Sequence, residues 1–289
     1  MPHDRDPGLQ AVLASFDIGP DHLLGVGGEA RVYALDDDRV IRVPRGDTDA
    51  AGVHERRLLV NELRTTRCPF RLPEIVSVGE VDGRVFSIER RLPGTSLVQQ
   101  LSRLGGRDRD VLIENHLDAS VGLAGLTMRP RDWFGELIGE RPLRAPTWKE
   151  YLRNRAVSSL SAAGNEFSQV DAARLADDMP EIAGTAFVHL DACAANMLAI
   201  GTTITAVLDI GITSVVGDPD LDPVAAVTYI STPCITPGAT TRDADVAMTW
   251  LRNAGLDDRL FPTQRWLAAY WSFATNDIEL HKWCRSVLL

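Results

Sequence analysis

Four polar side chains between residues 189 and 209 have types and a spacing that could support chemistry. His189, Asp191 and Asn196 form the pattern H-x-D-x-x-x-x-N, and Asp209 opens a D-x-G after a strand-like run. Transfer of a phosphoryl group requires oxygen ligands for Mg²⁺ and a group that orients an attacking hydroxyl. We therefore predict that Asn196 and Asp209 are metal ligands and that Asp191 is the base. His189 is expected to brace the loop by hydrogen bonding.

The segment resembles the aminoglycoside phosphotransferase family, relatives of protein kinases that phosphorylate hydroxyls on antibiotics and metabolites. The usual pattern of that family is H-G-D-x-x-x-x-N followed by I-D-[FW]-[GE], and this chain keeps its His189, Asp191, Asn196 and Asp209 at the same spacings. Residues 217–222 resemble the G-D-P-x-x-D segment of the family, which opens a helix. Its aspartates are expected to cap and brace that helix. The resemblance runs through about 20–285 and implies a protein-kinase-like bilobal fold.

The chain departs from the family pattern at three places. Leu190 replaces a frequent glycine, residues 192–195 replace a loop that often contains His and Pro, and Ile210 stands where an aromatic residue is common. None of these changes removes the base or a metal ligand. Cys193 lies inside this loop, but no base motif accompanies it, so we interpret it as a packing residue rather than a nucleophile.

A glycine cluster in the first part of the chain could approach a phosphate. Gly25, Gly27 and Gly28 lie between two strand-like runs, where backbone N–H groups without side chains can come close to phosphate oxygens. The cluster resembles a shortened glycine-rich phosphate loop. Taken alone, a glycine cluster between strands is more often a plain turn.

The third strand of a kinase-like lobe should carry a cation that pairs with the nucleotide phosphates and with a glutamate on the next helix. The first lysine of this chain is Lys149, so a strict lysine is excluded and a Walker A loop with it. Arg42 stands at the matching position, and related phosphotransferases also accept arginine there. Glu55 is the predicted helix partner, with Glu62 as the second choice; a solvated strand residue is the alternative for Arg42.

The resemblance also implies a hinge that binds adenine through its backbone. By family position this hinge covers residues 89–92 and includes Glu89, Arg90 and Leu92. The cofactors that the resemblance implies are ATP, or GTP, and Mg²⁺.

The elements that position these residues divide the chain into a β-rich first part and a helical second part. We predict a nucleotide-binding lobe over 1–92 and a catalytic and substrate-binding lobe over 93–289, an α+β arrangement with a small β-rich N-terminal lobe and a larger helical C-terminal lobe. Alternating and apolar runs predict strands near 30–34, 39–44, 75–81, 84–88, 185–188, 197–200 and 203–208. Helices are expected at 48–64, 97–104, 110–126, 147–160, 171–178, 221–229, 241–254 and 264–287.

Composition narrows the class of partner. Thirty basic and forty acidic side chains leave a net charge of −10, which disfavours nucleic acid. No run of about 18 uncharged apolar residues and no apolar leader is present, so we expect no membrane partner and a cytoplasmic location. The acidity is compatible with a cationic small-molecule substrate, and a monomer or a dimer is expected.

The sequence thus favours an ATP- and Mg²⁺-dependent kinase that phosphorylates a hydroxyl of a cationic small molecule, with an aminoglycoside antibiotic as the preferred acceptor and resistance as the role. Kinases of cationic peptide antibiotics, macrolides, choline or homoserine are alternatives. A pseudokinase that binds nucleotide without turnover is the non-enzymatic alternative. A protein kinase is disfavoured because no A-P-E segment follows the D-x-G.

Overall fold

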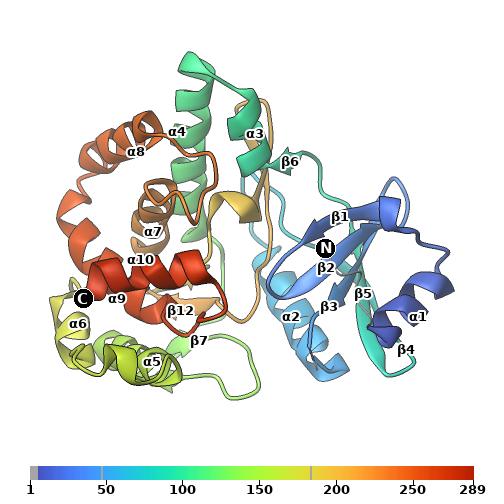
Figure 1. The fold of residues 1–289 in the computed structure, drawn as a ribbon, viewed down its shortest axis with the longest axis horizontal. Coiled ribbons are helices and arrows are strands. Elements are labelled where there is room, and N and C mark those ends of the chain that lie inside the picture. Colours follow the sequence, from blue (N-terminus) through green and yellow to red (C-terminus); the bar gives the residue numbers. More distant parts are fainter. Residues whose placement is uncertain (1–5, 47, 183) are drawn as a thin grey trace.

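The chain folds into a β-rich part and a helical part that lie side by side (Figure 1). The structure is a computed structural model that describes residues 6–46, 48–182 and 184–289. Its first part is built on a five-stranded antiparallel sheet in the order β1-β2-β3-β5-β4. The bounds are β1 Leu23–Val26, β2 Ala30–Ala34, β3 Arg39–Pro44, β4 Ile75–Val81 and β5 Arg84–Arg90, with the helices α1 Pro7–Ser15 and α2 Ala50–Leu63 and the short η1 Pro20–His22.

Helix α1 is absent from the predicted elements, although Leu9, Val12 and Leu13 stand at the helical spacing i, i+3, i+4. Asp6 caps it by accepting a hydrogen bond from Leu9 N at 3.1 Å, and Pro7 occupies its first turn. Leu9, Val12 and Leu13 of the helix pack in a small core with strand residues such as Ile41 and Phe86. The helix therefore covers one face of the sheet.

Helix α2 agrees with the predicted helix at 48–64, and its buried face contains a charged residue beside the apolar ones. Leu58 is 70% exposed, whereas Arg56 is only 6% exposed. The buried positions Val53, Arg56 and Leu59 follow the helical spacing i, i+3, i+6. A cation thus lies on the inner face of the helix, and a pattern of apolar residues alone cannot reveal it.

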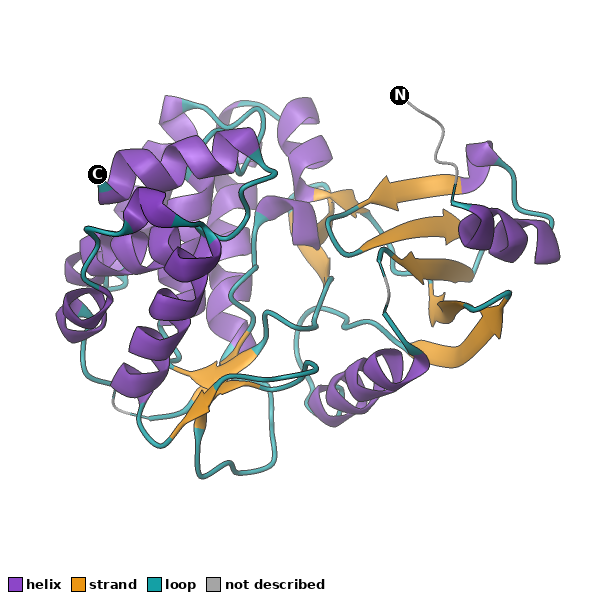
Figure 2. Ribbon diagram, turned by 60° about the horizontal axis from the view of Figure 1, so that its bottom comes forward, coloured by secondary structure: helices purple, strands orange, loops and turns teal. Residues whose placement is uncertain are grey.

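The second part is mostly helical, with two small sheets near the junction (Figure 2). One sheet has the order β11-β10-β6 and the other β8-β7-β12-β9. The strands are β6 Thr95–Ser96, β7 Phe134–Glu136, β8 Arg144–Ala145, β9 Ala186–Val188, β10 Met197–Ile200, β11 Thr203–Val207 and β12 Val215–Gly217. The helices are α3 Leu97–Arg103, α4 Gly106–Leu123, α5 Trp148–Ala162, α6 Ala172–Asp178, α7 Leu221–Ile230, α8 Thr241–Asn253, α9 Leu260–Trp271 and α10 Ile278–Leu288, with the short η2 Asn165–Phe167, η3 Ala194–Asn196 and η4 Asp257–Arg259.

The single helix predicted at 264–287 is wrong, because two helices occupy that region. Helix α9 ends at Trp271, and α10 begins at Ile278. Between them, Asp277 accepts a hydrogen bond from Leu280 N at 3.0 Å and starts a new helix. An aspartate at this position favours an N-terminal cap over the interior of a helix.

One apolar core joins the two parts. It contains Leu59 and Leu63 of α2, Leu112 and Leu117 of α4, and Val207 beside the D-x-G segment. The strands that carry the predicted site therefore stand on packed helices from both sides of the junction. The predicted α+β arrangement, with a β-rich first part and a helical second part, is confirmed, whereas the boundary at residue 92 stays a prediction.

Among the described residues, no helix has both the length and the apolar composition needed to cross a membrane.

Candidate active site

The predicted catalytic residues lie on one strand–loop–hairpin unit. Strand β9 ends at Val188, the loop carries His189 and Asp191, and η3 ends at Asn196. The antiparallel pair β10 and β11 then returns the chain to Asp209. Leu208 N donates to Asn196 O at 2.7 Å, so the end of β11 lies directly against the loop. The structure therefore brings together the four residues that the motif selected.

His189 joins the loop to the segment that carries Asp209. Its Nε2 lies 2.7 Å from Leu208 O, and its Nδ1 lies 3.3 Å from Asp191 N. A carbonyl oxygen can only accept, so Nε2 carries the proton, and Nδ1 accepts the hydrogen bond from the Asp191 amide. The fully buried ring thus makes bracing contacts to both chain segments of the site.

Asp191 and Asn196 hold each other across the loop. Asn196 Nδ2 donates to Asp191 Oδ2 and to Asp191 O, both at 2.9 Å. Desolvation by burial raises the pKa of Asp191 to about 6, and the charge of Asp209 also raises it. His189, Cys193 and Asn196 act in the opposite direction. A carboxyl group with this pKa is ionised at pH 7 and can accept a proton near neutral pH.

Cys193 is a packing residue in the structure, as predicted. Its side chain lies in the second apolar core and is 7% exposed. Burial raises the pKa of the thiol well above its usual value, and the charge of Asp191 adds to this. A protonated, buried thiol is a poor nucleophile.

Asp222, the last aspartate of the 217–222 segment, binds the backbone of the catalytic loop. Its two carboxylate oxygens accept hydrogen bonds from His189 N at 2.7 Å and Leu190 N at 2.8 Å. Burial raises the pKa of Asp222 to about 6. The expected cap is not formed, because Asp220 occupies the cap position of α7 without a side-chain hydrogen bond. Asp222 instead satisfies two amides of the catalytic loop.

Tyr229 of α7 supports the same turn from its other side. Its hydroxyl donates to Leu190 O at 2.7 Å and accepts a hydrogen bond from Trp271 Nε1 at 3.0 Å. Both polar groups of the Leu190 backbone are therefore satisfied inside the protein, which buried backbone requires.

Leu190 itself has a left-handed backbone with a φ of 64°. This conformation favours glycine, the residue that the family pattern often has here. The side chain of Leu190 is nevertheless fully buried in the apolar core that also contains Tyr229 and Trp266. The strain of the backbone and the burial of the side chain therefore oppose each other at this residue.

Asp209 is held by Arg42, which lies on strand β3 of the other part of the chain. Arg42 Nη2 lies 2.6 Å from Asp209 Oδ1 and 3.3 Å from Glu29 Oε2. The backbone of Asp209 is left-handed, with a φ of 57°. Burial raises the pKa of Glu29, and so does the charge of Asp209, while Arg42 lowers it. The predicted cation thus faces the predicted metal ligand.

The predicted pairing of Arg42 with Glu55 is wrong. Glu55 is exposed and accepts a hydrogen bond from Gly139 N at 3.4 Å. The second choice, Glu62, pairs with Arg131 at 3.2 Å. The reason is the rotation of α2: its inner face carries Arg56, so the neighbouring Glu55 turns about 100° away from the site.

Arg56, rather than a glutamate, lies on the inner face of α2, so the charge there is opposite to the one predicted. Its Nη1 lies 2.6 Å from Glu89 Oε1, and its Nε donates to Ile210 O at 2.9 Å. Ser87 Oγ also donates to Glu89 at 2.8 Å. Burial alone would raise the pKa of Glu89, but the charges of Arg56 and Arg42 lower it. Glu89 was predicted as a hinge residue, and its side chain instead completes this buried ion pair.

The remaining residues of the predicted hinge differ in whether their backbone N–H is already hydrogen-bonded. Arg90 N donates to Glu74 O at 2.9 Å, and Arg91 N donates to Asp38 O at 2.8 Å. Leu92 N has no hydrogen-bond acceptor among the described residues. The glycines of the predicted phosphate loop are equally open: an added Cβ at Gly25 or Gly28 would meet no atom within 4 Å.

Sequence reasoning missed Glu29, Arg56 and Tyr229. Glu29 directly follows the glycine cluster, a position that could have signalled a partner for Arg42. Arg56 stands at i+3 from Val53 and at i−3 from Leu59, a spacing that could have marked it as inward-facing. No local signal in the sequence connects Tyr229 with Leu190, because the contact spans 39 residues.

Replacing Arg56 with methionine should lower the free energy of unfolding by about 3–5 kcal/mol, because Glu89 would remain buried without a countercharge. The double substitution R56M/E89M should recover most of this loss. Urea denaturation of both variants measures the effect, with Arg57→Met on the same helix as the control. Equal losses for R56M and R57M would contradict a strong role for the buried pair.

Replacing Leu190 with glycine should destabilise the protein, despite the left-handed backbone. Relief of the left-handed backbone strain should stabilise the protein by about 1–2 kcal/mol, whereas removal of a buried leucine side chain costs about 2–5 kcal/mol. Leu190→Ala, which keeps most of the strain, should be similarly unstable in thermal or urea unfolding. A glycine variant more stable than the parent would show that backbone strain dominates.

Comparisons with known proteins agree with this geometry. A model of the phosphotransferase enzyme family matches residues 22–253. The structure is similar to that of APH(2'')-IIa in its gentamicin complex, with a TM-score of 0.63 and 15% identity over 99% of this chain and 96% of that chain. ADP-bound aminoglycoside phosphotransferase APH(2'')-Ib gives a TM-score of 0.61 and 16% identity over 99% and 97% of the two chains.

A third relative comes from Streptomyces rimosus. It is aminoglycoside phosphotransferase APH(3'')-Id in complex with ADP and streptomycin, with a TM-score of 0.57 and 16% identity over 92% of this chain and 96% of that chain. At these identities the similarity establishes a common fold. A search of curated proteins found none that matches. The family match covers most of the chain and includes the whole motif, so the chain belongs to the phosphotransferase enzyme family and is a small-molecule kinase.

Proposed function

We propose that this kinase uses ATP or GTP with Mg²⁺ to phosphorylate a hydroxyl of a cationic small molecule, and that an aminoglycoside-type antibiotic is the acceptor. The observation that carries the proposal is the convergence of Asp191, Asn196 and Asp209 at the end of one hairpin, opposite Arg42. Resistance to the antibiotic and a cytoplasmic location, where ATP is available, belong to the same proposal.

Asp191 is the proposed base. Its raised pKa suits a group that must be ionised before the reaction and able to take the hydroxyl proton during it. Asn196 Nδ2 donates to Asp191 Oδ2, and Oδ1 of Asp191 is the oxygen proposed to accept the hydroxyl proton. His189 and Asp222 fix the loop, and so they set where the proton acceptor lies.

The oxygens of Asn196 and Asp209 suit a hard cation. Asn196 Nδ2 donates to Asp191. The Oδ1 of Asn196 has no protein partner among the described residues. Asp209 uses Oδ1 for Arg42, and its Oδ2 has no hydrogen-bond partner among the described residues. Carboxylate and amide oxygens are the ligands that Mg²⁺ prefers. A bound Mg²⁺ would neutralise charge on the transferring phosphates.

The nucleotide is proposed to lie between the two parts of the chain. Gly25, Gly27 and Gly28 have ordinary φ angles, so backbone conformation does not require glycine there. Close approach of phosphate oxygens to the loop would explain them. The planar guanidinium of Arg42 can donate two hydrogen bonds to the same phosphates. In the predicted hinge, the backbone N–H of Leu92 has no acceptor among the described residues and could bind the purine ring of the nucleotide.

The acceptor class rests on chemistry and on the similar structures. Gentamicin and streptomycin, the aminoglycosides in two of the similar complexes, carry amino groups and hydroxyls. The present chain has eleven Asp and Glu against six Lys and Arg from His189 onward, which suits a cation. Asp243 is not available for it, because its buried carboxylate pairs with Arg109 at 2.6 Å. Choline-, homoserine-, macrolide- or peptide-type acceptors are the alternatives.

Asp191→Asn should lower kcat by about 10²–10⁴-fold with little change in nucleotide affinity, because it removes the proton acceptor alone. Asp209→Asn should abolish the part of nucleotide binding that depends on Mg²⁺. Transfer of labelled phosphate from ATP and from GTP to a panel of aminoglycosides and other hydroxylated amines measures both, with exposed Asp258→Asn as the control. Mg²⁺-dependent nucleotide binding without transfer to any acceptor would indicate a pseudokinase.

The pH dependence should reflect ionisation of Asp191. The base works in its charged form, so kcat/KM should fall as the pH drops through about 6, by about tenfold per unit below that value. Cys193→Ala removes a hydrogen bond that lowers the pKa of Asp191, so the acid limb should move to higher pH. An acid limb that stays in place or moves to lower pH would contradict this assignment.

A further inference from the structure

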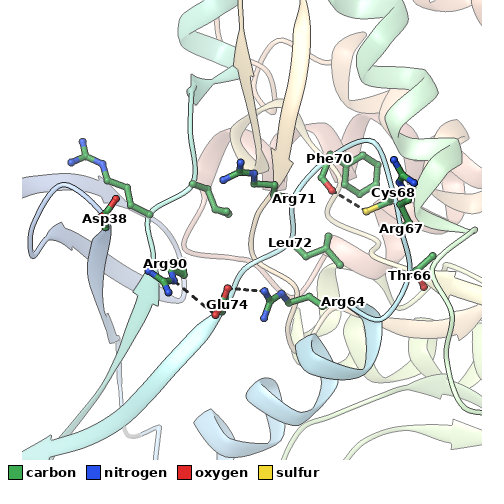
Figure 3. A pocket seen from close by; sticks show the side chains of 12 residues that line it. Asp38, Arg64, Thr66, Arg67, Cys68, Phe70, Arg71, Leu72, Glu74 and Arg90 are labelled. Atoms are coloured by element: carbon green, nitrogen blue, oxygen red, sulfur yellow. Dashed lines mark hydrogen bonds and ion pairs between the residues drawn. The ribbon is translucent and has the colours of Figure 1, made fainter.

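A polar pocket lies at the junction of the two parts, beside the predicted hinge (Figure 3). Its volume is about 580 Å³, within the range of small-molecule sites. It is formed by the turn before β3, the segment from the end of α2 to β4, and the segment that follows β5. The lining residues are Asp38, Arg64, Thr66, Arg67, Cys68, Phe70, Arg71, Leu72, Glu74, Arg90, Arg91 and Leu92.

The charge of this pocket is opposite to that of the chain. Five arginines and two carboxylates line it, whereas the whole protein has a net charge of −10. A local excess of three positive charges in an acidic protein attracts anions and repels the cationic acceptor of the active site. The pocket is therefore suited to a different ligand from the one proposed for the motif.

The ion pairs inside the pocket leave part of the positive charge unmatched. Glu74 lies between Arg64, at 2.6 Å, and Arg90, at 3.9 Å, as the dashed lines in Figure 3 show. Arg67 and Arg71 have no carboxylate partner among the described residues. Two guanidinium groups on the same loop thus remain available to an external anion.

The loop that carries these arginines is fixed in place. Arg71 N donates to Thr205 O at 2.9 Å, and Val207 N donates to Arg71 O at 3.0 Å, which joins the loop to strand β11. The adjacent Phe70 and Leu72 are buried in the main core. A binding group on an anchored backbone loses less conformational freedom when it binds, which favours affinity.

We propose that this pocket is a binding site for a small anion that carries two or more phosphate groups. A planar guanidinium group can donate two parallel hydrogen bonds to phosphate oxygens, so Arg67, Arg71 and a third arginine of the lining, Arg91, could engage more than one phosphate. The site contains none of Arg42, Asp191, Asn196 and Asp209, so it does not depend on the proposed reaction. A ligand there would contact Arg90 and Leu92 of the predicted hinge.

Binding of inorganic tripolyphosphate to the full chain, measured by calorimetry in EDTA and at low salt, tests the proposal. The charge reversal R67E/R71E should weaken binding by about tenfold or more. R42A should leave it unchanged, because Arg42 belongs to the catalytic site. R103E/R252E is the matched control: both arginines are exposed, have no ion-pair partner among the described residues, and give the same change in charge.

Three results would overturn the site. The parent protein could fail to bind tripolyphosphate, binding could be lost in R42A rather than in R67E/R71E, or the control could weaken as much as R67E/R71E. Thermal unfolding checks that each variant is folded, and R67Q/R71Q replaces the reversal if that variant is not. A fall in affinity as the salt concentration rises should accompany specific binding.

Discussion

The buried guanidinium of Arg56 is the point on which the arrangement of the site depends. It binds Glu89 of the sheet and the carbonyl of Ile210, directly after Asp209. One side chain of α2 therefore fixes the helix to strand β5 and to the segment with the proposed metal ligand. In protein kinases, the strand supplies the cation and the helix supplies the glutamate. Here the helix supplies a cation and the strand a carboxylate, and Arg42 pairs with Asp209 and Glu29 instead of a helix glutamate.

The rest of the site is supported from the helical part. Asp222 and Tyr229 of α7 satisfy the amides and the carbonyl of the loop that carries Asp191. Because these contacts lie inside the apolar core, water cannot replace them without loss of packing. The loop is therefore held in one conformation before any substrate arrives. Such preorganisation is how an enzyme holds reacting groups in position without an entropic cost at each turnover.

Local signals in the sequence predicted the motif, most strands and most helices, because spacing and periodicity are properties of short segments. The partners of these residues were harder to predict. Glu55 was chosen because the kinase pattern places a glutamate on this helix opposite the strand cation, and only the buried Glu89 makes the inward Arg56 favourable. The break before α10 depends on a single capping aspartate, Asp277, which apolar periodicity does not report.

Leu190 limits which substitutions the catalytic loop can accept in evolution. Its left-handed backbone suits glycine, while its side chain fills space in the core beside Tyr229. A return to glycine would leave a void unless a neighbour became larger, and a larger neighbour would clash while the leucine remained. The two changes are therefore expected to be neutral only together. Relatives with glycine at this position should accordingly carry bulkier residues around it, a covariation that an alignment of close homologues would reveal.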